Sequence, residues 1–298
     1  MIQIEPKEEQ TVSSIKKLPP WFSQKIPDKQ TIKKMKDLMR GAGLHTVCEE
    51  AHCPNMGECF KEGTATFMIL GDVCTRRCGF CAVESGEPRS INHMEPAEVA
   101  KAVQALNLKY VVITSVTRDD LEDGGAGHFA RTVVEIRKLM PWVKIEVLIP
   151  DLENNTGSIE TVVHSKPFVI GHNIETVRRL FDKVRPQADY ERSLSVLKNI
   201  KVIDDSNLTK SGFMVGLGES KDDIIALMND LKDARCDILT VGQYLAPSKD
   251  KRHFKVERFV GPDEFKEYEY LARAIGFKHV MSGPLVRSSY RAEMVIQG

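Results

Sequence analysis

The sequence predicts an α/β protein in which a partial (β/α)6-type barrel carries an extension at each end. Short apolar runs rich in Val, Ile and Thr alternate with helical patterns, and this alternation is typical of βαβ units in a parallel sheet. Six or seven such units suit a barrel better than an open sheet. Polar residues also follow the strands, where barrels place their active sites. An open doubly wound sheet is the alternative, because a sequence does not show whether a sheet closes.

The predicted strands are short buried runs bounded by polar or Gly-rich segments. They cover residues 64–70, 110–116, 143–151, 167–173, 210–218, 237–245 and 279–286. Between them, apolar residues recur with the period of an amphipathic helix. The helices expected from this period include residues 94–107, 124–141, 173–184, 189–203 and 220–234.

Motifs and composition divide the chain into three parts. Residues 1–62 form an N-terminal arm with a cysteine-bearing segment, residues 63–280 form the barrel, and residues 281–298 form a C-terminal segment. The arm is polar, Lys-rich and interrupted by prolines, so we expect it to be solvated rather than to form a basic binding patch.

Charge and hydropathy exclude several classes of function. The 42 basic and 42 acidic residues balance, so we expect no nucleic-acid partner and no binding to an acidic membrane surface. No apolar run reaches the ~18 residues of a membrane span. The N-terminal residues lack the apolar stretch of a secretory signal, so we expect a cytoplasmic protein.

Three cysteines lie close together in the segment GDVCTRRCGFC, just after the first predicted strand. Cys74, Cys78 and Cys81 have the spacing C-x3-C-x2-C. Three thiolates can hold three irons of a [4Fe–4S] cluster and leave the fourth iron open for a small molecule. A zinc ion with a histidine as fourth ligand is the alternative, but the spacing differs from the paired C-x2-C of zinc ribbons.

A second triad precedes the first, in the segment VCEEAHCPNMGECF. Cys48, Cys53 and Cys59 have the spacing C-x4-C-x5-C and also lack a fourth ligand within the motif. His45 and His52 are close in sequence, although a solvent-facing role is the simpler interpretation of both. The seventh cysteine, Cys236, stands alone and is interpreted as an ordinary buried thiol.

The first triad, with Phe80 before its last cysteine, resembles the cluster motif of the radical S-adenosylmethionine (radical SAM) superfamily. Both triads together resemble those of the lipoyl synthases, and the likeness extends from about residue 45 to the C-terminus. It includes the segments VITSVTRDDLEDGGAGHF, HNIETV, RPQADYERSL, KSGFMVGLGE, VGQYLAPS and GPLVRSSYRAE.

The resemblance implies a sulfurtransferase that inserts sulfur at C6 and C8 of an octanoyl chain. In that family the chain is attached to a lysine of a lipoyl domain or another carrier protein. S-Adenosylmethionine binds the open iron of the first cluster, and its reductive cleavage gives a 5′-deoxyadenosyl radical. The second [4Fe–4S] cluster supplies the sulfur. The expected partners are therefore the octanoylated carrier protein and a reductant such as ferredoxin or flavodoxin.

The resemblance also assigns roles to residues outside the triads. Ser289, the second serine of RSSY, becomes the fourth ligand of the auxiliary cluster on Cys48, Cys53 and Cys59. A hydroxyl that caps the last element is the simpler alternative for Ser289. Arg287 is expected to touch that cluster or the substrate, or else to form a surface salt bridge. The residues expected to contact S-adenosylmethionine are Thr114, Ser115, Glu175, Arg192, Gly216 and Glu219.

Three positions differ from the family's usual pattern. Gly79 stands where a proline is usual, Gly171 replaces an asparagine, and Arg291 replaces a histidine. None of these changes removes a cluster ligand, so we expect them to affect geometry rather than reaction class. The competing functions are another radical SAM sulfur-inserting enzyme and a non-catalytic iron–sulfur or zinc-binding module.

Overall fold

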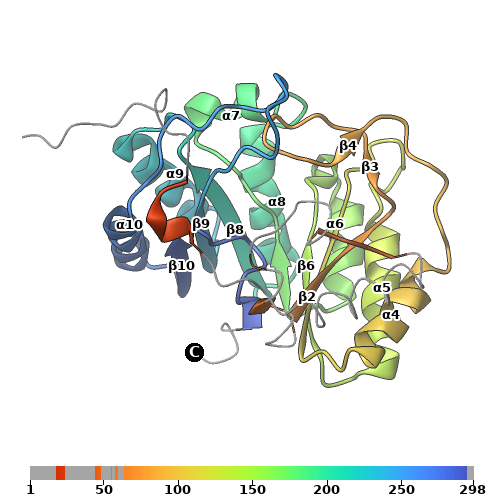
Figure 1. The fold of residues 1–298 in the computed structure, drawn as a ribbon. Coiled ribbons are helices and arrows are strands. Elements are labelled where there is room, and N and C mark those ends of the chain that lie inside the picture. Colours follow the sequence, from red (N-terminus) through yellow and green to blue (C-terminus); the bar gives the residue numbers. More distant parts are fainter. Residues whose placement is uncertain (1–17, 24–43, 48–54, 56–57, 60–63, 294–298) are drawn as a thin grey trace, which may run out of the picture.

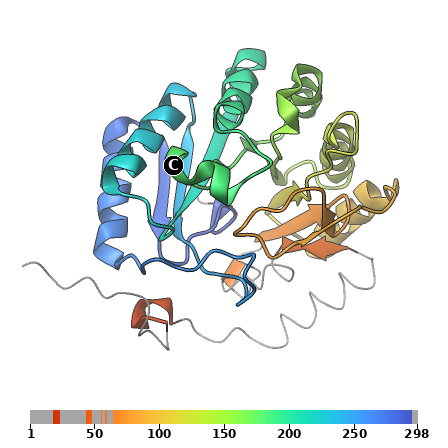
Figure 2. The same ribbon diagram turned by 90° about the horizontal axis from the view of Figure 1, so that it is seen from above.

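A computed structural model describes residues 18–23, 44–47, 55, 58–59 and 64–293 of the chain. Its main feature is one eight-stranded sheet of order β1-β2-β5-β6-β7-β8-β9-β10, in which every pairing except β1 with β2 is parallel. Strands β1 and β10 form the two edges, so the sheet curves without closing. The helices lie in an arc around its outer side (Figure 1, Figure 2). The predicted partial barrel is confirmed.

The strands and helices alternate along the chain as the sequence predicts. The strands are β1 (His45–Thr46), β2 (Thr64–Ile69), β3 (Val73–Cys74), β4 (Glu84–Ser85), β5 (Tyr110–Ser115), β6 (Lys144–Leu148), β7 (Val169–Gly171), β8 (Leu208–Val215), β9 (Ile238–Gln243) and β10 (His279–Gly283). The helices are η2 (Pro20–Phe22), α4 (Glu95–Ala105), α5 (Ala126–Leu139), η3 (Leu152–Asn154), α6 (Thr156–His164), α7 (Arg178–Val184), α8 (Tyr190–Ile203), α9 (Lys221–Asp233) and α10 (Pro262–Ile275). None of these helices is long and apolar enough to span a membrane.

The two faces of the sheet differ in chemistry because side chains alternate along each strand. Phe67, Ile113 and Val147 belong to the apolar core beneath the helices. The alternate positions, which face the concave side, include the buried polar side chains of Glu146 and Lys210. The inside of the barrel is therefore partly polar, while its outside carries the hydrophobic core.

A buried ion pair lies at the base of this concave face. The ammonium of Lys210 is 2.8 Å from Glu146 Oε1, and the Tyr110 hydroxyl donates to Glu146 Oε2 at 2.7 Å. Burial, together with the Glu146 carboxylate, raises the pKa of Tyr110 well above its ordinary value. Tyr110 therefore stays protonated and keeps its hydrogen bond.

Residues near the C-terminus, from Leu285 to Glu293, cross the concave face. Val286 lies so close to β9 that a Cβ on Gly242 would be 2.1 Å from its carbonyl oxygen. Further along, Ala292 is fully buried against Tyr110 and Val112 of β5. Residues 285–293 of the C-terminal segment thus run along the inner side of the sheet. The three-part domain division stays a prediction.

The structure corrects the expected helix at residues 173–184, which begins only at Arg178. Before it, Glu175 continues the sheet: its N–H donates to Gly212 O at 3.0 Å and its carbonyl accepts from Met214 N at 2.9 Å. These bonds to β8, with a φ of 69° at Glu175, prevent a helical path. Helices α6 and α10 fill two further intervals between the predicted strands.

Candidate functional site

The cysteine loop begins at the carboxyl end of β2 and is fixed by backbone contacts on several sides. Gly79 N donates to Val184 O at 2.9 Å, and Phe254 N donates to Gly79 O at 3.0 Å. His253 Nε2 lies 3.0 Å from the carbonyl oxygen of Cys81. The loop is thus held between the end of α7 and the loop that follows β9.

The three thiols of this loop are half-buried, and they lie close enough together for one to affect the pKa of another. Burial raises the pKa of Cys81 to about 12, and the neighbouring Cys78, Cys74 and Glu175 act in the same direction. Burial also raises the pKa of Cys78, against the effect of the Arg185 guanidinium. Cluster or metal loading must therefore displace protons from these sulfurs.

The sulfur of Cys74 already accepts two backbone donors, Arg76 N at 3.4 Å and Thr117 N at 3.3 Å. Such N–H···S contacts orient a ligand and tune a bound cluster. Among the described residues, no three His, Cys, Asp or Glu side chains gather as they would around a single metal ion. A cubane cluster does not require that gathering, because each cysteine binds a different iron.

A buried charge network supports the loop from below. Arg76 donates two bonds to Asp151, both at 2.8 Å, and two to Asp119, at 2.8 and 2.7 Å. Arg192 Nε reaches the same Asp151 at 3.0 Å. The pKa of Asp151 stays below its ordinary value, because these hydrogen bonds and nearby positive charge outweigh the effect of its burial. The ion pair with Asp151 thus fixes the guanidinium of Arg192, a residue expected to contact S-adenosylmethionine.

Several buried polar atoms near this loop have no hydrogen-bond partner in the described structure. They are Ser115 Oγ, His172 Nε2, Asn173 Oδ1 and Arg185 Nε. Ser115 ends β5, His172 and Asn173 follow β7, and Arg185 follows the end of α7. Arg185 also acts to lower the pKa of Cys78. Buried polar atoms are normally paired, so this set fits a polar ligand bound beside the cysteine loop.

Burial shifts the pKa values of Glu175 and His172 in opposite directions, and in both cases it favours the neutral form. Burial raises the pKa of Glu175, which the Arg185 guanidinium partly offsets. Burial lowers the pKa of His172 to about 4, and its Nδ1 lies 3.0 Å from Ile149 O. A neutral His172 that donates from Nδ1 leaves Nε2 as an acceptor toward a ligand.

The other residues expected to contact S-adenosylmethionine have partners within the protein. Thr114 Oγ1 donates to Leu148 O at 2.9 Å. The Glu219 carboxylate accepts the N–H groups of Gly216 at 2.6 Å and Leu217 at 2.9 Å. Gly216 has a φ of 98°, and a Cβ there would be 2.1 Å from Gln243 Nε2. Gly216 and Glu219 therefore shape the loop after β8, and their contact with S-adenosylmethionine stays a prediction.

The second triad is only partly visible, since Cys48 and Cys53 lie outside the described residues. Cys59 is half-buried, and it adds to the effects of burial and of the Glu58 hydrogen bond in raising the pKa of Tyr290, so it lies close to the RSSY segment. The neighbouring Glu58 accepts the Tyr290 hydroxyl at 3.0 Å and the Arg291 guanidinium at 2.6 Å. Ser289, half-buried, directly precedes Tyr290. The structure thus brings Ser289 and Cys59 into the same region, across 230 residues of sequence.

Arg287 lies at the inner side of β9. Its Nη1 donates to the carbonyl oxygen of Val286 at 2.7 Å and would be 3.5 Å from a Cβ on Gly242. The residue is half-buried. A contact with the auxiliary cluster or the substrate stays a prediction.

The three departures from the family pattern each have a structural consequence. A Cβ at Gly79 would lie 2.3 Å from Cε2 of Phe254, so the glycine makes room for that ring. At Gly171 a Cβ would be 3.3 Å from Cδ1 of Leu148, a tight contact. Arg291 forms the ion pair with Glu58. The first and third changes therefore add specific packing and charge contacts.

Gly79→Ala is expected to lower the free energy of unfolding by about 1–3 kcal/mol, the usual effect of overpacking. The new methyl group would overlap the Phe254 ring. Urea denaturation checks this, with Gly86→Ala as control, since a Cβ there makes only an ordinary 3.5 Å contact with Val73. Adding Phe254→Leu should restore much of the loss. Equal midpoints for the two alanine variants would contradict the packing described.

Lowering the pH from 7 to 4 is expected to remove about 3 kcal/mol of stability through His172 alone. Its folded pKa of about 4 lies below the ordinary 6.5, so the unfolded chain takes up the proton first. The loss begins near pH 6.5 and levels off below about pH 4. Urea midpoints of His172→Asn should therefore fall less over this range, while the exposed control His164→Asn behaves like the parent chain.

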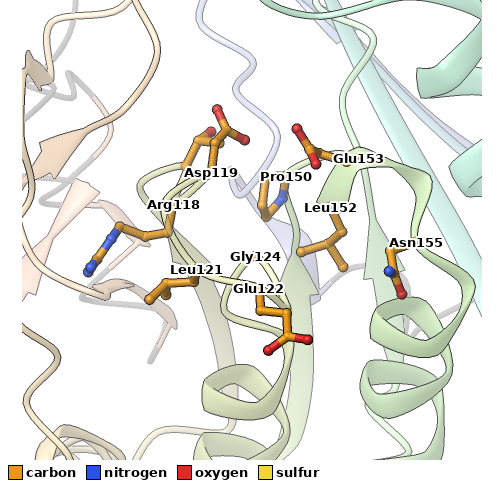
Figure 3. Close-up of a pocket in the computed structure, with 10 residues that line it drawn as sticks. Arg118, Asp119, Leu121, Glu122, Gly124, Pro150, Leu152, Glu153 and Asn155 are labelled. Carbon is orange, nitrogen blue, oxygen red and sulfur yellow. The ribbon is translucent and has the colours of Figure 1, made fainter.

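A separate cavity of about 180 Å³ opens next to the charge network (Figure 3). It is lined by the loops after β5 and β6, at Thr117, Arg118, Asp119, Leu121, Glu122, Gly124, Pro150, Leu152, Glu153 and Asn155. None of the residues expected to contact S-adenosylmethionine lines it. Asp119, which bonds Arg76, connects the cavity to the cysteine loop.

Sequence reasoning missed the supporting residues Arg76, Asp151 and Arg185 as parts of the site. Two of them carried a usable signal: Arg76 lies inside the cysteine motif, and Asp151 ends the third predicted strand. Arg185 precedes a proline at the end of α7 and carried no such signal. His172 lies in the segment HNIETV, and the sequence assigned no role to it.

Known proteins resemble this chain over most of its length. Residues 68–231 match the family model of the radical SAM superfamily, and residues 3–53 match that of the N-terminal domain of lipoyl synthase. The chain is 53% identical to a lipoyl synthase of Caldanaerobacter subterraneus subsp. tengcongensis, over 93% of this chain and 96% of the relative. It is 55% identical to one of Caldicellulosiruptor bescii, over 93% and 94%.

Solved structures support the fold at much lower identity. A methylornithine synthase aligns with a TM-score of 0.52 and 14% identity, over 90% of this chain and 84% of that one. HydG, a maturase of the [FeFe]-hydrogenase, aligns with a TM-score of 0.56 and 14% identity, over 85% and 70%. From its sequence relatives, the chain belongs to the lipoyl synthase family of the radical SAM superfamily.

Proposed function

We propose that the protein inserts two sulfur atoms, at C6 and C8, into an octanoyl chain carried on a lysine of a lipoyl domain or similar carrier protein. The observation that carries this proposal is the pair of cysteine sites in one barrel. Cys74, Cys78 and Cys81 lie at the carboxyl end of β2, and Cys59 lies beside the RSSY segment. One site for making a radical and one for donating sulfur are what this reaction requires.

The residues around the first site fit a [4Fe–4S] cluster with S-adenosylmethionine. Cys74, Cys78 and Cys81 would hold three irons, and the unpartnered atoms of Ser115 and His172 offer hydrogen bonds to a polar ligand. When bound, this pair supplies the one-electron cleavage that makes a hydrogen-abstracting carbon radical. The protein's part is to orient the sulfurs, to balance charge with Arg185 and to keep His172 neutral.

Thr114, Glu175, Arg192, Gly216 and Glu219 complete the proposed S-adenosylmethionine site. The half-buried Glu175 carboxylate would suit the amino group of the ligand, because it acts on the thiols of Cys78 and Cys81 and so lies beside the cysteine loop. Arg192 is suited to the carboxylate of the ligand, although it must share its charge with Asp151. The ends of strands β5 and β8 would complete the site: there Thr114 bonds Leu148 and Glu219 bonds Gly216, which keeps these strand ends in place around the ligand.

For the second site we propose Cys48, Cys53, Cys59 and Ser289 as ligands of the auxiliary cluster, with Arg287 close to it or to the substrate. A serine oxygen is a harder and weaker ligand for iron than a thiolate, so that corner can open during sulfur transfer. We further propose a small electron-transfer protein, such as ferredoxin or flavodoxin, as the reductant.

Mass spectrometry of an octanoyl-lysine peptide tests the function. The chain is reconstituted anaerobically and incubated with the peptide, S-adenosylmethionine and dithionite. We expect about eight irons per chain, 5′-deoxyadenosine, and a peptide that has gained two sulfur atoms. Formation of 5′-deoxyadenosine without sulfur in the peptide would favour another radical SAM reaction. Absence of both products in fully loaded protein would favour a non-catalytic module.

A further inference from the structure

Glu58 connects the two distant segments that meet around Cys59. Its Oε1 accepts Arg291 Nε at 3.1 Å and Nη2 at 2.6 Å, while its Oε2 accepts the Tyr290 hydroxyl at 3.0 Å. Both carboxylate oxygens are therefore used, and both bind the same short stretch of the C-terminal segment. Glu58 directly precedes Cys59, and Tyr290 directly follows Ser289.

The backbone of this stretch transmits the contact to Ser289. Tyr290 N donates to Arg287 O at 2.9 Å, which closes a turn around residues 287–290. Arg291 has a φ of 49°, in the left-handed region that favours glycine. A residue without a compensating contact rarely adopts this conformation. The ion pair with Glu58 therefore stabilises the backbone next to the turn that contains Ser289.

Other contacts anchor the ends of the segment independently. Asn55 Nδ2 donates to Leu285 O at 2.6 Å, and Thr64 Oγ1 donates to Glu293 Oε2 at 2.9 Å. Ala292 is fully buried. The ion pair itself is half-exposed, with 47% of the Arg291 side chain and 37% of the Glu58 side chain accessible. Its loss should therefore leave the fold intact and change the middle of the segment.

We propose that Glu58 is a positioning residue that, through Tyr290 and Arg291, holds Ser289 beside Cys59 so that Ser289 can ligate the auxiliary cluster. This inference rests on the proposed function, because it assumes a cluster on Cys59. It adds to that function the contact that decides whether the serine stays at the cluster. The contact depends on this chain's Arg291, which the family pattern does not lead one to expect.

The first test uses the metal-free chain and hydrogen–deuterium exchange of residues 285–293. Arg291→Gln and Glu58→Gln should each speed exchange there about threefold to fivefold, the effect of losing an exposed ion pair. The matched control is Arg273→Gln on α10, whose pair with Glu269 has a similar length of 2.8 Å and similar exposure, 54% and 37%. Equal exchange of residues 285–293 in Arg291→Gln and Arg273→Gln would overturn the proposal that Glu58 holds this segment.

The second test reports on ligation at position 289 in the reconstituted chain. Ser289→Cys offers a fourth thiolate, so a chelator should remove iron from the auxiliary cluster more slowly than from the parent chain. Adding Arg291→Gln should abolish this slowing, whereas adding Arg273→Gln should preserve it. The charge reversal Glu58→Arg with Arg291→Glu should restore part of it. Slowing that survives Arg291→Gln would overturn the positioning role.

The two tests separate this inference from the proposed function. If the parent chain holds only one cluster with all its cysteines intact, the proposed function fails and the role of Ser289 fails with it. The exchange measurement does not depend on any cluster, so it still decides whether Glu58 holds the segment. If two clusters form and the Arg291→Gln and Glu58→Gln variants exchange like the parent chain, only the positioning role of Glu58 is overturned.

Discussion

Cys78→Ala is expected to reduce the cleavage of S-adenosylmethionine to background, whereas Cys59→Ala should leave cleavage measurable and abolish the thiolated product. The reason is the separation of the two cysteine sites. Cys78 lies in the loop after β2, among the thiols that influence one another and next to Arg185. Cys59 lies against the C-terminal segment, beside Tyr290.

Two products are measured for each variant: 5′-deoxyadenosine by chromatography and thiolated octanoyl peptide by mass spectrometry. Cys74→Ala and Cys81→Ala should behave like Cys78→Ala, and Cys48→Ala and Cys53→Ala like Cys59→Ala. Cys236→Ala is the control, because this thiol is fully buried among the apolar side chains of the core. Equal loss of cleavage from both sets, in well-folded protein, would mean that the division of roles is wrong.

Lys210→Met is expected to lower the free energy of unfolding by about 3–5 kcal/mol, the usual effect of leaving a buried charge unpaired. Glu146 is 1% exposed and would keep only the hydrogen bond from the Tyr110 hydroxyl. No solvent reaches the site to replace the lost ammonium. Urea denaturation monitored by far-ultraviolet circular dichroism measures the change.

The double variant Lys210→Met with Glu146→Gln is the matched control. It removes both charges and leaves the glutamine oxygen to accept the Tyr110 hydroxyl, so most of the lost stability should return. Lys278→Met gives a second comparison, because its pair with Asp237 is 2.8 Å long but the lysine side chain is 59% exposed. A double variant less stable than Lys210→Met would contradict this account.

Local sequence patterns predicted the parallel strands because each is a short buried apolar run, too short to form a buried helix. The strand at 110–116 and the helix at 220–234 agree with β5 and α9 to within a residue or two at each end. The start of α7 was wrong because bonds to β8, almost 40 residues further on, decide the conformation of Glu175. A helical period in the sequence carries no information about such a partner.

The same distinction applies to the site. The cysteine spacing could be read directly from the sequence, since the three proposed ligands of one cluster lie within eight residues. The partner of Arg76 is 75 residues away at Asp151, and the ring that occupies the space at Gly79 belongs to Phe254. Glu219, whose contact with S-adenosylmethionine stays a prediction, accepts the backbone N–H of Gly216, three residues before it. Tertiary contacts of this kind follow from the folded geometry and have no local pattern.

The position of the C-terminal segment also bears on the order in which the protein is completed during synthesis. Asn55 and Leu285, which are hydrogen-bonded, are 230 residues apart. At ribosomal rates of about 5–20 residues per second, the partner of Asn55 emerges about 10–50 s later. Phe254, which donates a backbone hydrogen bond to Gly79 in the loop with Cys74, Cys78 and Cys81, emerges before that. A nascent or truncated chain that ends before Leu285 therefore contains the first cysteine site but lacks the surroundings of Cys59.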